Sequence, residues 1–180
     1  MQKVYMREPK ITLNAPKIDE ERILHFSLQE ALPSTHTLAL NLAFGTMSYI
    51  ACVGDRPLLL MQEQFTNGEM SVLLPLLESF PYYCPYEIMF AHFYNGKISD
   101  KIVARCRQHL QAAAEEGLWD QEMRPVRSAL SRARLKLRPF GIDISSILAT
   151  GYILMITNRA PQTESAEPSN VSAKWGRNPA

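Results

Sequence analysis

The chain has 180 residues, of which 46% are hydrophobic and 21% are charged, and its formal net charge is +1 at pH 7. This composition excludes collagen-like and extended disordered chains, and the length favours one compact domain. No apolar run approaches the ~20 residues that a membrane-spanning helix needs, and the N-terminus lacks the apolar core of a secretory signal. We therefore expect a cytoplasmic protein with no membrane partner.

The first half of the chain has the pattern of an antiparallel sheet. Residues 1–36 contain Pro9, Pro16 and Pro33 and predict an irregular N-terminal arm with one short helical or extended piece. Apolar residues then alternate with small or polar ones over residues 37–44 and 47–53, which predicts a β-hairpin. Leu58-Leu59-Leu60-Met61 supplies a third strand after a turn.

Helix signals follow the predicted sheet. Thr66 and Glu69 have the spacing of a capping box, so we expect a helix to begin there. Pro85 is suited to the first turn of a second helix, which runs to about residue 94. Ser99 is suited to cap a third, amphipathic helix over residues 99–116. The fold class expected from these elements is α+β.

The charge is distributed unevenly along the chain. Residues 124–138 hold five arginines and one lysine without any acid, so the rest of the chain carries −5. Pro125 is expected at the first position of a helix whose apolar residues recur every three or four positions. This buried seam consists of Val126, Leu130, Ala133 and Leu137. The opposite side carries Arg124, Ser128, Ser131, Leu135 and Arg138, with Arg127 and Arg134 on one shoulder and Arg132 and Lys136 on the other.

This helix has the pattern expected of an element that enters the major groove of DNA. Small residues on the outer side let the helix axis approach the bases, cations on both shoulders meet phosphates, and an arginine can bind guanine with two hydrogen bonds. The alternative is a solvated arginine-rich surface. Such surfaces usually interleave acids with the cations, and the absence of acids here favours an anion-binding helix.

Residues 143–146 and 151–156 are two short apolar runs that predict a C-terminal β-hairpin. Residues 157–180 are rich in Asn, Pro, Ser, Ala and Thr, and we expect a disordered tail there. No internal repeat is visible in the sequence.

Three segments together resemble a known family. Val126-Arg127-Ser128-Ala129-Leu130-Ser131-Arg132-Ala133-Arg134-Leu135-Lys136-Leu137, Pro139-Phe140-Gly141-Ile142-Asp143-Ile144 and Thr150-Gly151-Tyr152-Ile153-Leu154 resemble the C-terminal half of winged helix-turn-helix effector domains of the OmpR/PhoB type. Residues 66–74 and 84–90 are similar to the first and second helices of that family. The resemblance covers residues 37–156, and its closing segment is the most specific part.

The resemblance implies a fold and a set of contact residues. The domain would span residues 37–156, with a recognition helix at 124–137, a β-hairpin wing and an inserted helix within 95–123. Tyr152 would pack under the wing. The DNA-binding residues would be Arg124, Arg127, Ser128, Ser131, Arg132, Arg134, Lys136 and, in the wing turn, Thr150.

The chain departs from the family at three places. Leu148 stands in the wing where the family often has arginine, and the segment 95–123 replaces a short loop. Residues 1–36 are too few for the receiver domain that usually precedes the effector domain.

The function expected from the sequence is sequence-specific binding of double-stranded DNA in transcriptional regulation. The alternative is a protein-interaction module on the same scaffold, in which the helix at 99–116 contacts RNA polymerase or another protein. A second copy of the chain, forming a homodimer, is a further candidate partner.

We expect neither an enzyme nor a metal or cofactor site. Cys84 and His92 have no aligned orienting group, and the Cys106–His109 spacing lacks a second pair of metal ligands. The chain has an odd number of cysteines, and their spacings do not suit a disulfide framework. We therefore expect Cys52, Cys84 and Cys106 to be reduced thiols in the core.

Overall fold

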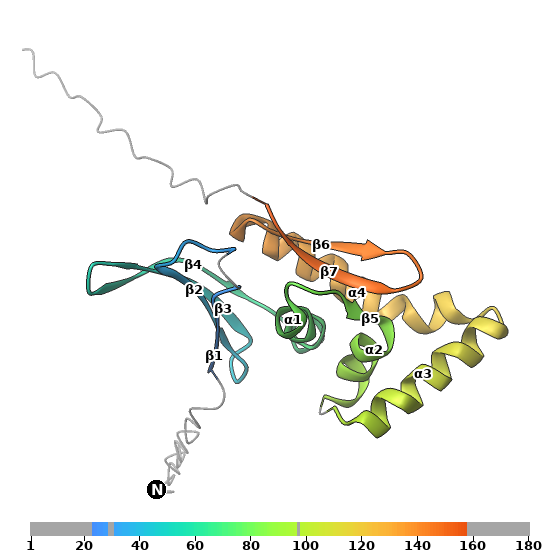
Figure 1. Cartoon of the computed structure of the whole chain (residues 1–180). Helices are drawn as coiled ribbons and strands as arrows, with labels where there is room; N and C mark the ends of the chain where they lie inside the picture. Colours follow the sequence, from blue (N-terminus) through green and yellow to red (C-terminus); the bar gives the residue numbers. More distant parts are fainter. Residues whose placement is uncertain (1–22, 29–30, 97, 158–180) are drawn as a thin grey trace, which may run out of the picture.

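Figure 1 shows the computed structural model of the chain, which describes residues 23–28, 31–96 and 98–157. The expectations of an arm over residues 1–22 and of a disordered tail over residues 158–180 lie outside these described residues. The described chain has a mixed α+β fold, as expected.

The first half of the fold is a four-stranded antiparallel sheet, which confirms the sequence pattern. Its strands lie in chain order: β1 (Ile23–Phe26), β2 (His36–Asn41), β3 (Thr46–Val53) and β4 (Arg56–Gln64). Leu38 pairs with Tyr49 and Leu40 with Met47, and these four side chains are buried on the inner face. Phe44 was expected in a strand, but it lies in the β2–β3 turn and is exposed.

The sheet begins earlier in the chain than the sequence suggested. Strand β1 lies within the range 1–36 that we interpreted as an arm, and it pairs with β2 along its whole length. Leu24 and Phe26 also pack against the core. Its sequence, Ile-Leu-His-Phe, does not alternate between apolar and polar residues, so it lacks the period-two pattern by which the hairpin strands were found.

Helix α1 (Asn67–Ser79) begins with the capping box that the sequence predicted. The backbone N–H of Glu69 donates to the Thr66 hydroxyl, and the N–H of Thr66 donates to the Glu69 carboxylate. Pro75 lies inside the helix without ending it. Leu73 and Leu76 are fully buried around it, so apolar packing outweighs the hydrogen bond that proline cannot donate.

Strand β5 (Cys84–Pro85) and helix α2 (Tyr86–Asn95) follow α1. Pro85 is thus the N-cap residue of α2 and precedes its first helical position. Helix α3 (Asp100–Glu115) is the predicted additional helix, and its N-cap Ser99 accepts a hydrogen bond from the N–H of Ile102, as expected.

Helix α4 (Trp119–Leu137) corrects the expected start of the basic helix at residue 124. Residues 119–123, which were placed in the insertion, belong to α4, and Pro125 lies inside the helix. Gly117, at a φ of 73°, ends α3 and allows α4 to begin at once. Asp120 and Glu122 then stabilise the first turn of α4 through the helix dipole, while Met123 is fully buried.

A second antiparallel sheet closes the fold. A short 3₁₀ helix (Arg138–Phe140) leads into β6 (Ile142–Ile147) and β7 (Gly151–Ile156), which form the predicted C-terminal hairpin. Strand β5 pairs with the other side of β7.

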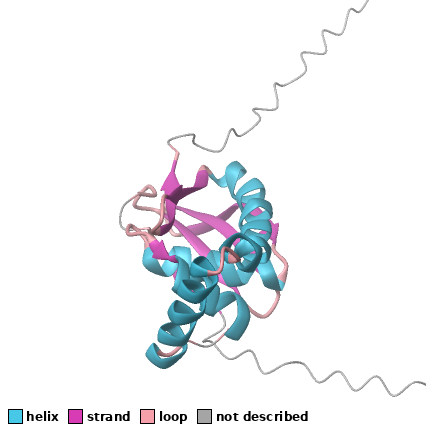
Figure 2. Ribbon diagram, turned by 90° about the vertical axis from the view of Figure 1, so that its right-hand side faces the viewer, coloured by secondary structure: helices cyan, strands magenta, loops and turns pink. Residues whose placement is uncertain are grey.

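Helix α1 lies between the two sheets, and the β6–β7 hairpin lies along α4 (Figure 1). Figure 2 views the molecule from the end that carries α2 and α3, with the strands behind these helices. None of the described helices combines the length and the apolar character needed to cross a membrane.

The cysteines differ in their surroundings. Cys84 and Cys106 are buried free thiols, as expected, whereas Cys52 near the end of β3 is exposed, so the expectation of three core thiols was wrong for Cys52. Burial raises the pKa of the Cys84 thiol to about 12. Within the described ranges, no group of three His, Cys, Asp or Glu side chains is arranged to hold a metal ion.

Candidate nucleic-acid interface

Helix α4 has the two-sided character that its sequence predicted. The seam of Val126, Leu130, Ala133 and Leu137 is buried. The opposite side is exposed, and we call it the outer face; it consists of Arg124, Ser128, Ser131 and Leu135 of α4 and of Arg138, the first residue of the 3₁₀ helix that follows. Leu135 is 62% exposed, which makes it an unusual apolar side chain on a polar surface.

The cations of the outer face form no ion pair or side-chain hydrogen bond within the described part of the chain, although the charge of Arg138 acts on Asp143. Neither Arg124 nor Arg138 forms an ion pair or a side-chain hydrogen bond with another described residue. The hydroxyls of Ser128 and Ser131 are likewise without a described hydrogen-bond partner. These donors are therefore free to bind an external acceptor.

Arg127 on one shoulder of α4 is exposed but engaged by neighbouring side chains. Its guanidinium lies 2.8 Å from the Asp120 carboxylate and 4.8 Å from the centre of the Trp119 ring, and it hydrogen-bonds Tyr152. Partial burial alone would lower the pKa of Arg127, but these hydrogen bonds raise it above its usual value. Arg127 thus remains charged and well anchored.

Aromatic rings connect this anchor to the hairpin. Tyr86 of α2 contacts Trp119 and Tyr152 edge-to-face, with ring centres 5.0 and 5.4 Å apart. The Tyr86 hydroxyl donates to the carbonyl oxygen of Ile147 at 3.2 Å. Tyr152, in β7 of the hairpin, is largely buried. Helices α2 and α4 and the hairpin are therefore fixed relative to one another.

Arg134 on the same shoulder pairs with the hairpin. Its Nε and Nη2 donate to the two carboxylate oxygens of Asp143 in β6, at 2.5 and 3.1 Å. Hydrogen bonding by Arg134 holds the pKa of Asp143 below its usual value, so the pair stays ionised at neutral pH. Asp143 also accepts the N–H of Ile144, which fixes its orientation.

Arg132 and Lys136 on the other shoulder neutralise a buried carboxylate. Glu69 of α1 is only 2% exposed; Lys136 Nζ lies 2.7 Å and Arg132 Nε 3.3 Å from its oxygens. Lys136 also donates to the carbonyl oxygen of Gln64. Burial alone would raise the pKa of Glu69, but the hydrogen bonds from Lys136 and Thr66 and the charge of Lys136 lower it.

These ion pairs correct the interpretation of the basic run as a segment without opposing acids. Glu69, Asp120 and Asp143 lie outside residues 124–138, and the fold brings them to the six cations. The six cations and three carboxylates together carry +3 rather than +6. Two of these three net charges lie on the outer face, at Arg124 and Arg138, and the third remains where Arg132 and Lys136 share the single carboxylate of Glu69.

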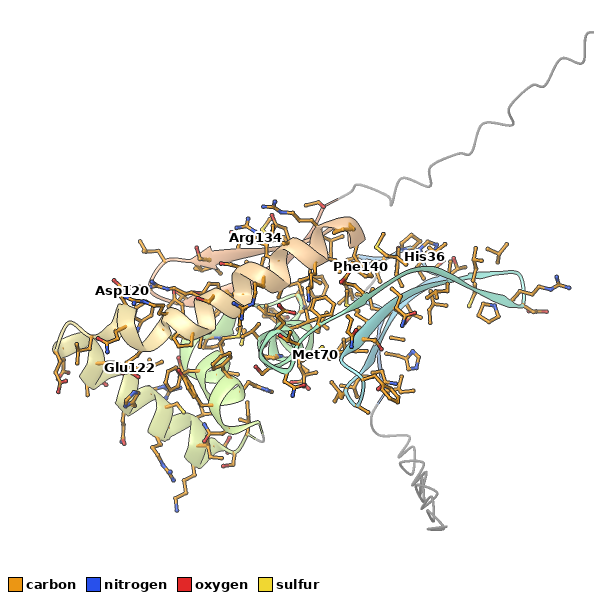
Figure 3. The ribbon with its side chains drawn as sticks, turned by 180° about the vertical axis from the view of Figure 1, so that it is seen from behind. His36, Met70, Asp120, Glu122, Arg134 and Phe140 are labelled. Carbon is orange, nitrogen blue, oxygen red and sulfur yellow. The ribbon has the colours of Figure 1, made fainter. Side chains whose placement is uncertain are left out.

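A groove of about 480 Å³ lies between α4 and the β6–β7 hairpin. We call it the α4–hairpin groove; it is lined by Tyr86, Arg127, Leu130, Ser131, Arg134, Ile144, Ser146, Leu148 and Tyr152. Figure 3 shows Asp120 and Arg134 near opposite ends of α4, with Glu122 on the side of α4 that faces α3.

The predicted site residues are thus separated into four places. Arg124 and Ser128 lie on the outer face together with Ser131, which also borders the groove. Arg127 and Arg134 line the groove, whereas Arg132 and Lys136 face α1. The Thr150 hydroxyl donates to the carbonyl oxygen of Leu148 within the hairpin turn.

Sequence reasoning did not find Trp119, Asp120, Asp143 and Ser146 as site residues. A signal existed only for Asp120, which lies seven residues, or about two helical turns, before Arg127. That spacing could not be used because α4 was expected to begin at residue 124.

Helix α3 has three polar side-chain contacts with its neighbours among the described residues, one of which is the hydrogen bond from Asn95 Nδ2 of α2 to the Cys106 sulfur. His109 lies 2.9 Å from the carboxylate of Glu122 in α4, and Arg107 lies 2.9 Å from Glu87 in α2. The remaining polar side of α3 points to solvent and does not reach the α4–hairpin groove.

Comparison with protein-family models, with curated proteins and with solved structures finds no match to this chain.

Proposed function

We propose that the chain is a winged helix-turn-helix domain of the OmpR/PhoB kind that binds double-stranded DNA sequence-specifically in transcriptional regulation. In this assignment α4 is the recognition helix and the β6–β7 hairpin is the wing. Support comes from the order of the elements: a four-stranded sheet, α1, α2, an amphipathic basic helix and a closing hairpin. Helix α3 is the insertion between the second helix and the recognition helix.

The observation that carries the proposal is the outer face of α4. It presents two cations that form no ion pair with a described residue, Arg124 in α4 and Arg138 directly after it, and two small hydroxyl residues on one exposed surface. Ser128 and Ser131 allow the helix to approach base edges closely, and Arg124 has the length and the fork geometry to bind guanine O6 and N7. Arg138, near the other end of the face, is assigned to a phosphate.

The structure modifies the roles of the other candidates within this proposal. Arg132 and Lys136 neutralise Glu69 and join the recognition helix to α1, so we assign them a positioning role. Arg127 and Arg134 are held by carboxylates beside the wing. Base reading is therefore assigned to Arg124, Ser128 and Ser131.

The dependence of DNA affinity on salt should reflect the reduced charge of α4. With about three net contacts, affinity for a labelled duplex should fall about 40-fold between 50 and 200 mM salt, because each phosphate contact releases counterions. Six phosphate contacts would give a fall of about 2,000-fold. Fluorescence anisotropy titrations at several salt concentrations measure this slope. Salt-independent retention of the duplex would speak against binding through phosphates.

Arg124→Ala should weaken binding to a preferred duplex about tenfold or more, because it removes a two-point contact to a base. Arg105→Ala is the matched control: Arg105 is an exposed arginine of α3 without an ion pair among the described residues. Both variants lose one positive charge. Equal losses of affinity in the two variants would show that only net charge matters and would remove Arg124 from the interface.

A protein-interaction module is the second candidate function, and one observation favours it. Leu148, at the tip of the hairpin, is 93% exposed where a phosphate-binding wing would carry a polar or basic residue. An exposed leucine at a hairpin tip suits an apolar pocket on a protein partner such as RNA polymerase or a second copy of the chain. The salt titration separates the two functions, since an apolar interface does not depend steeply on salt.

A further inference from the structure

The two arginines that line the α4–hairpin groove are both neutralised by carboxylates. Arg134 uses two nitrogens on Asp143, which is the two-point geometry that arginine also uses on phosphate. Arg127 uses one nitrogen on Asp120. A phosphate that entered the groove would therefore compete with a carboxylate already in place at each arginine.

We propose that Asp120 and Asp143 are restraining residues for DNA affinity: each holds a groove arginine in an internal ion pair and so keeps it from binding a DNA phosphate. This inference rests on the proposed DNA-binding function and adds a regulation of affinity to it. It explains how a segment with six cations presents only two unpaired ones on its DNA-facing side.

The two carboxylates restrain their arginines to different degrees. Asp143 is fixed in β6 by its own hydrogen bond to the N–H of Ile144, and Arg134 has no other described partner. Removing this carboxylate leaves Arg134 free to rotate towards a phosphate. Asp120 is 81% exposed, and its partner Arg127 is also held by Trp119 and Tyr152. Removing Asp120 therefore releases Arg127 only in part.

The test compares Asp143→Asn and Asp120→Asn with the matched control Asp55→Asn. Asp55, in the turn between β3 and β4, is exposed and has no ion pair with a described residue. All three variants lose one negative charge. Asparagine keeps the acceptor oxygen for the N–H of Ile144, so Asp143→Asn should fold, and thermal melting monitored by circular dichroism verifies this for each variant.

Asp143→Asn should bind a duplex of random sequence roughly tenfold more tightly at 50 mM salt and lose about 3.5-fold more affinity between 50 and 200 mM, as one added phosphate contact requires. Asp120→Asn should show a smaller gain, and Asp55→Asn should match the wild type. An unchanged affinity and salt slope in Asp143→Asn, with wild-type binding intact, would overturn the inference and leave the proposed function standing.

Arg134→Gln provides a second, independent measurement. On its own, Arg134→Gln leaves the Asp143 carboxylate without its ion-pair partner and should weaken DNA binding by charge repulsion, so the informative variant is the double one. In combination with Asp143→Asn it should abolish the gain. A double variant that still bound the duplex more tightly than the wild type would show that the gain does not come from Arg134 and would overturn the restraint. Failure of the wild type and of both Asn variants to bind any duplex would instead reject the DNA-binding function itself.

Discussion

Lys136→Met should lower the free energy of unfolding by about 3 kcal/mol, because it leaves a buried carboxylate without its closest cation. Glu69 is 2% exposed, and after this substitution only Arg132 and the Thr66 N–H would face its oxygens. Methionine retains most of the apolar length of lysine, so lost packing contributes little. Urea unfolding followed by circular dichroism measures the change. Lys101→Met, at an exposed lysine of α3 with no described ion-pair partner, is the control and should be nearly neutral.

Removing the charge of the other partner, Glu69, should lower the free energy of unfolding less than removing the lysine does. Glu69→Gln removes the negative charge, but Lys136 is 31% exposed and its ammonium group can turn to water. The double variant with Lys136→Met should recover part of the stability that Lys136→Met loses, since no unpaired charge remains buried. If the two single variants were equally destabilised and their effects simply added, the carboxylate and the ammonium group would not be coupled.

The ion pairs of Glu69 with Lys136 and Arg132 should make the stability of the fold depend on pH. The pKa of Glu69 is lower in the folded protein than its unperturbed value of 4.5, so its contribution is complete above about pH 4.5 and disappears as pH falls through the folded value. Wild type and Glu69→Gln should therefore converge in stability below about pH 4.5. A constant difference down to acidic pH would show that Glu69 acts through its hydrogen-bond geometry and not through its charge.

Gly151→Ala should destabilise the fold by about 3 kcal/mol, because strand β7 has no room for a side chain where it crosses β5. A Cβ atom at Gly151 would overlap the carbonyl oxygen of Cys84 and come within 2.9 Å of its carbonyl carbon and 3.0 Å of the Cα of Pro85. All three atoms belong to the backbone, so β5 and β7 would have to separate. The pairing of Cys84 with Tyr152 and of Pro85 with Gly151 would be lost.

Gly68→Ala is the control for this substitution. Gly68 lies in the first turn of α1, and its added Cβ would lie 3.6 Å from the ring of Phe93, an ordinary contact. Alanine is also the better helix former, so Gly68→Ala should be neutral or stabilising by up to about 1 kcal/mol. Urea unfolding separates the two variants. A stability of Gly151→Ala equal to that of the wild type would contradict the close approach of β5 and β7.

Local sequence patterns correctly predicted the structural features that residues close together in the chain determine. The capping box of Thr66 and Glu69, the buried seam of α4 and the C-terminal hairpin are each encoded within a few turns or strands of sequence, and the structure confirms them. The predicted start of α4 at residue 124 was wrong because proline is only preferred, and not required, at the first helical position. The burial of Met123 outweighs that preference.

The electrostatics of the candidate site could not be predicted from local sequence. Glu69 and Lys136 are 67 residues apart in the chain, and the packing of α1 on α4 joins them. Asp143 meets Arg134 only because β6 runs back along the helix. A basic run without acids therefore did not indicate an unpaired basic surface. The outer face was predicted correctly because helical periodicity alone determines which residues oppose a buried seam.

The most direct test of the central claim, that the outer face of α4 reads DNA, is a selection of random duplexes by the purified full chain at moderate salt, followed by sequencing of the retained pool. The account predicts a short enriched motif for the wild type and loss of preference at one base position for Arg124→Ala. The spacing of repeated half-sites would then give the geometry of a dimer on DNA. A pool that stays random, with retention no greater than that of a neutral control protein, would contradict the claim.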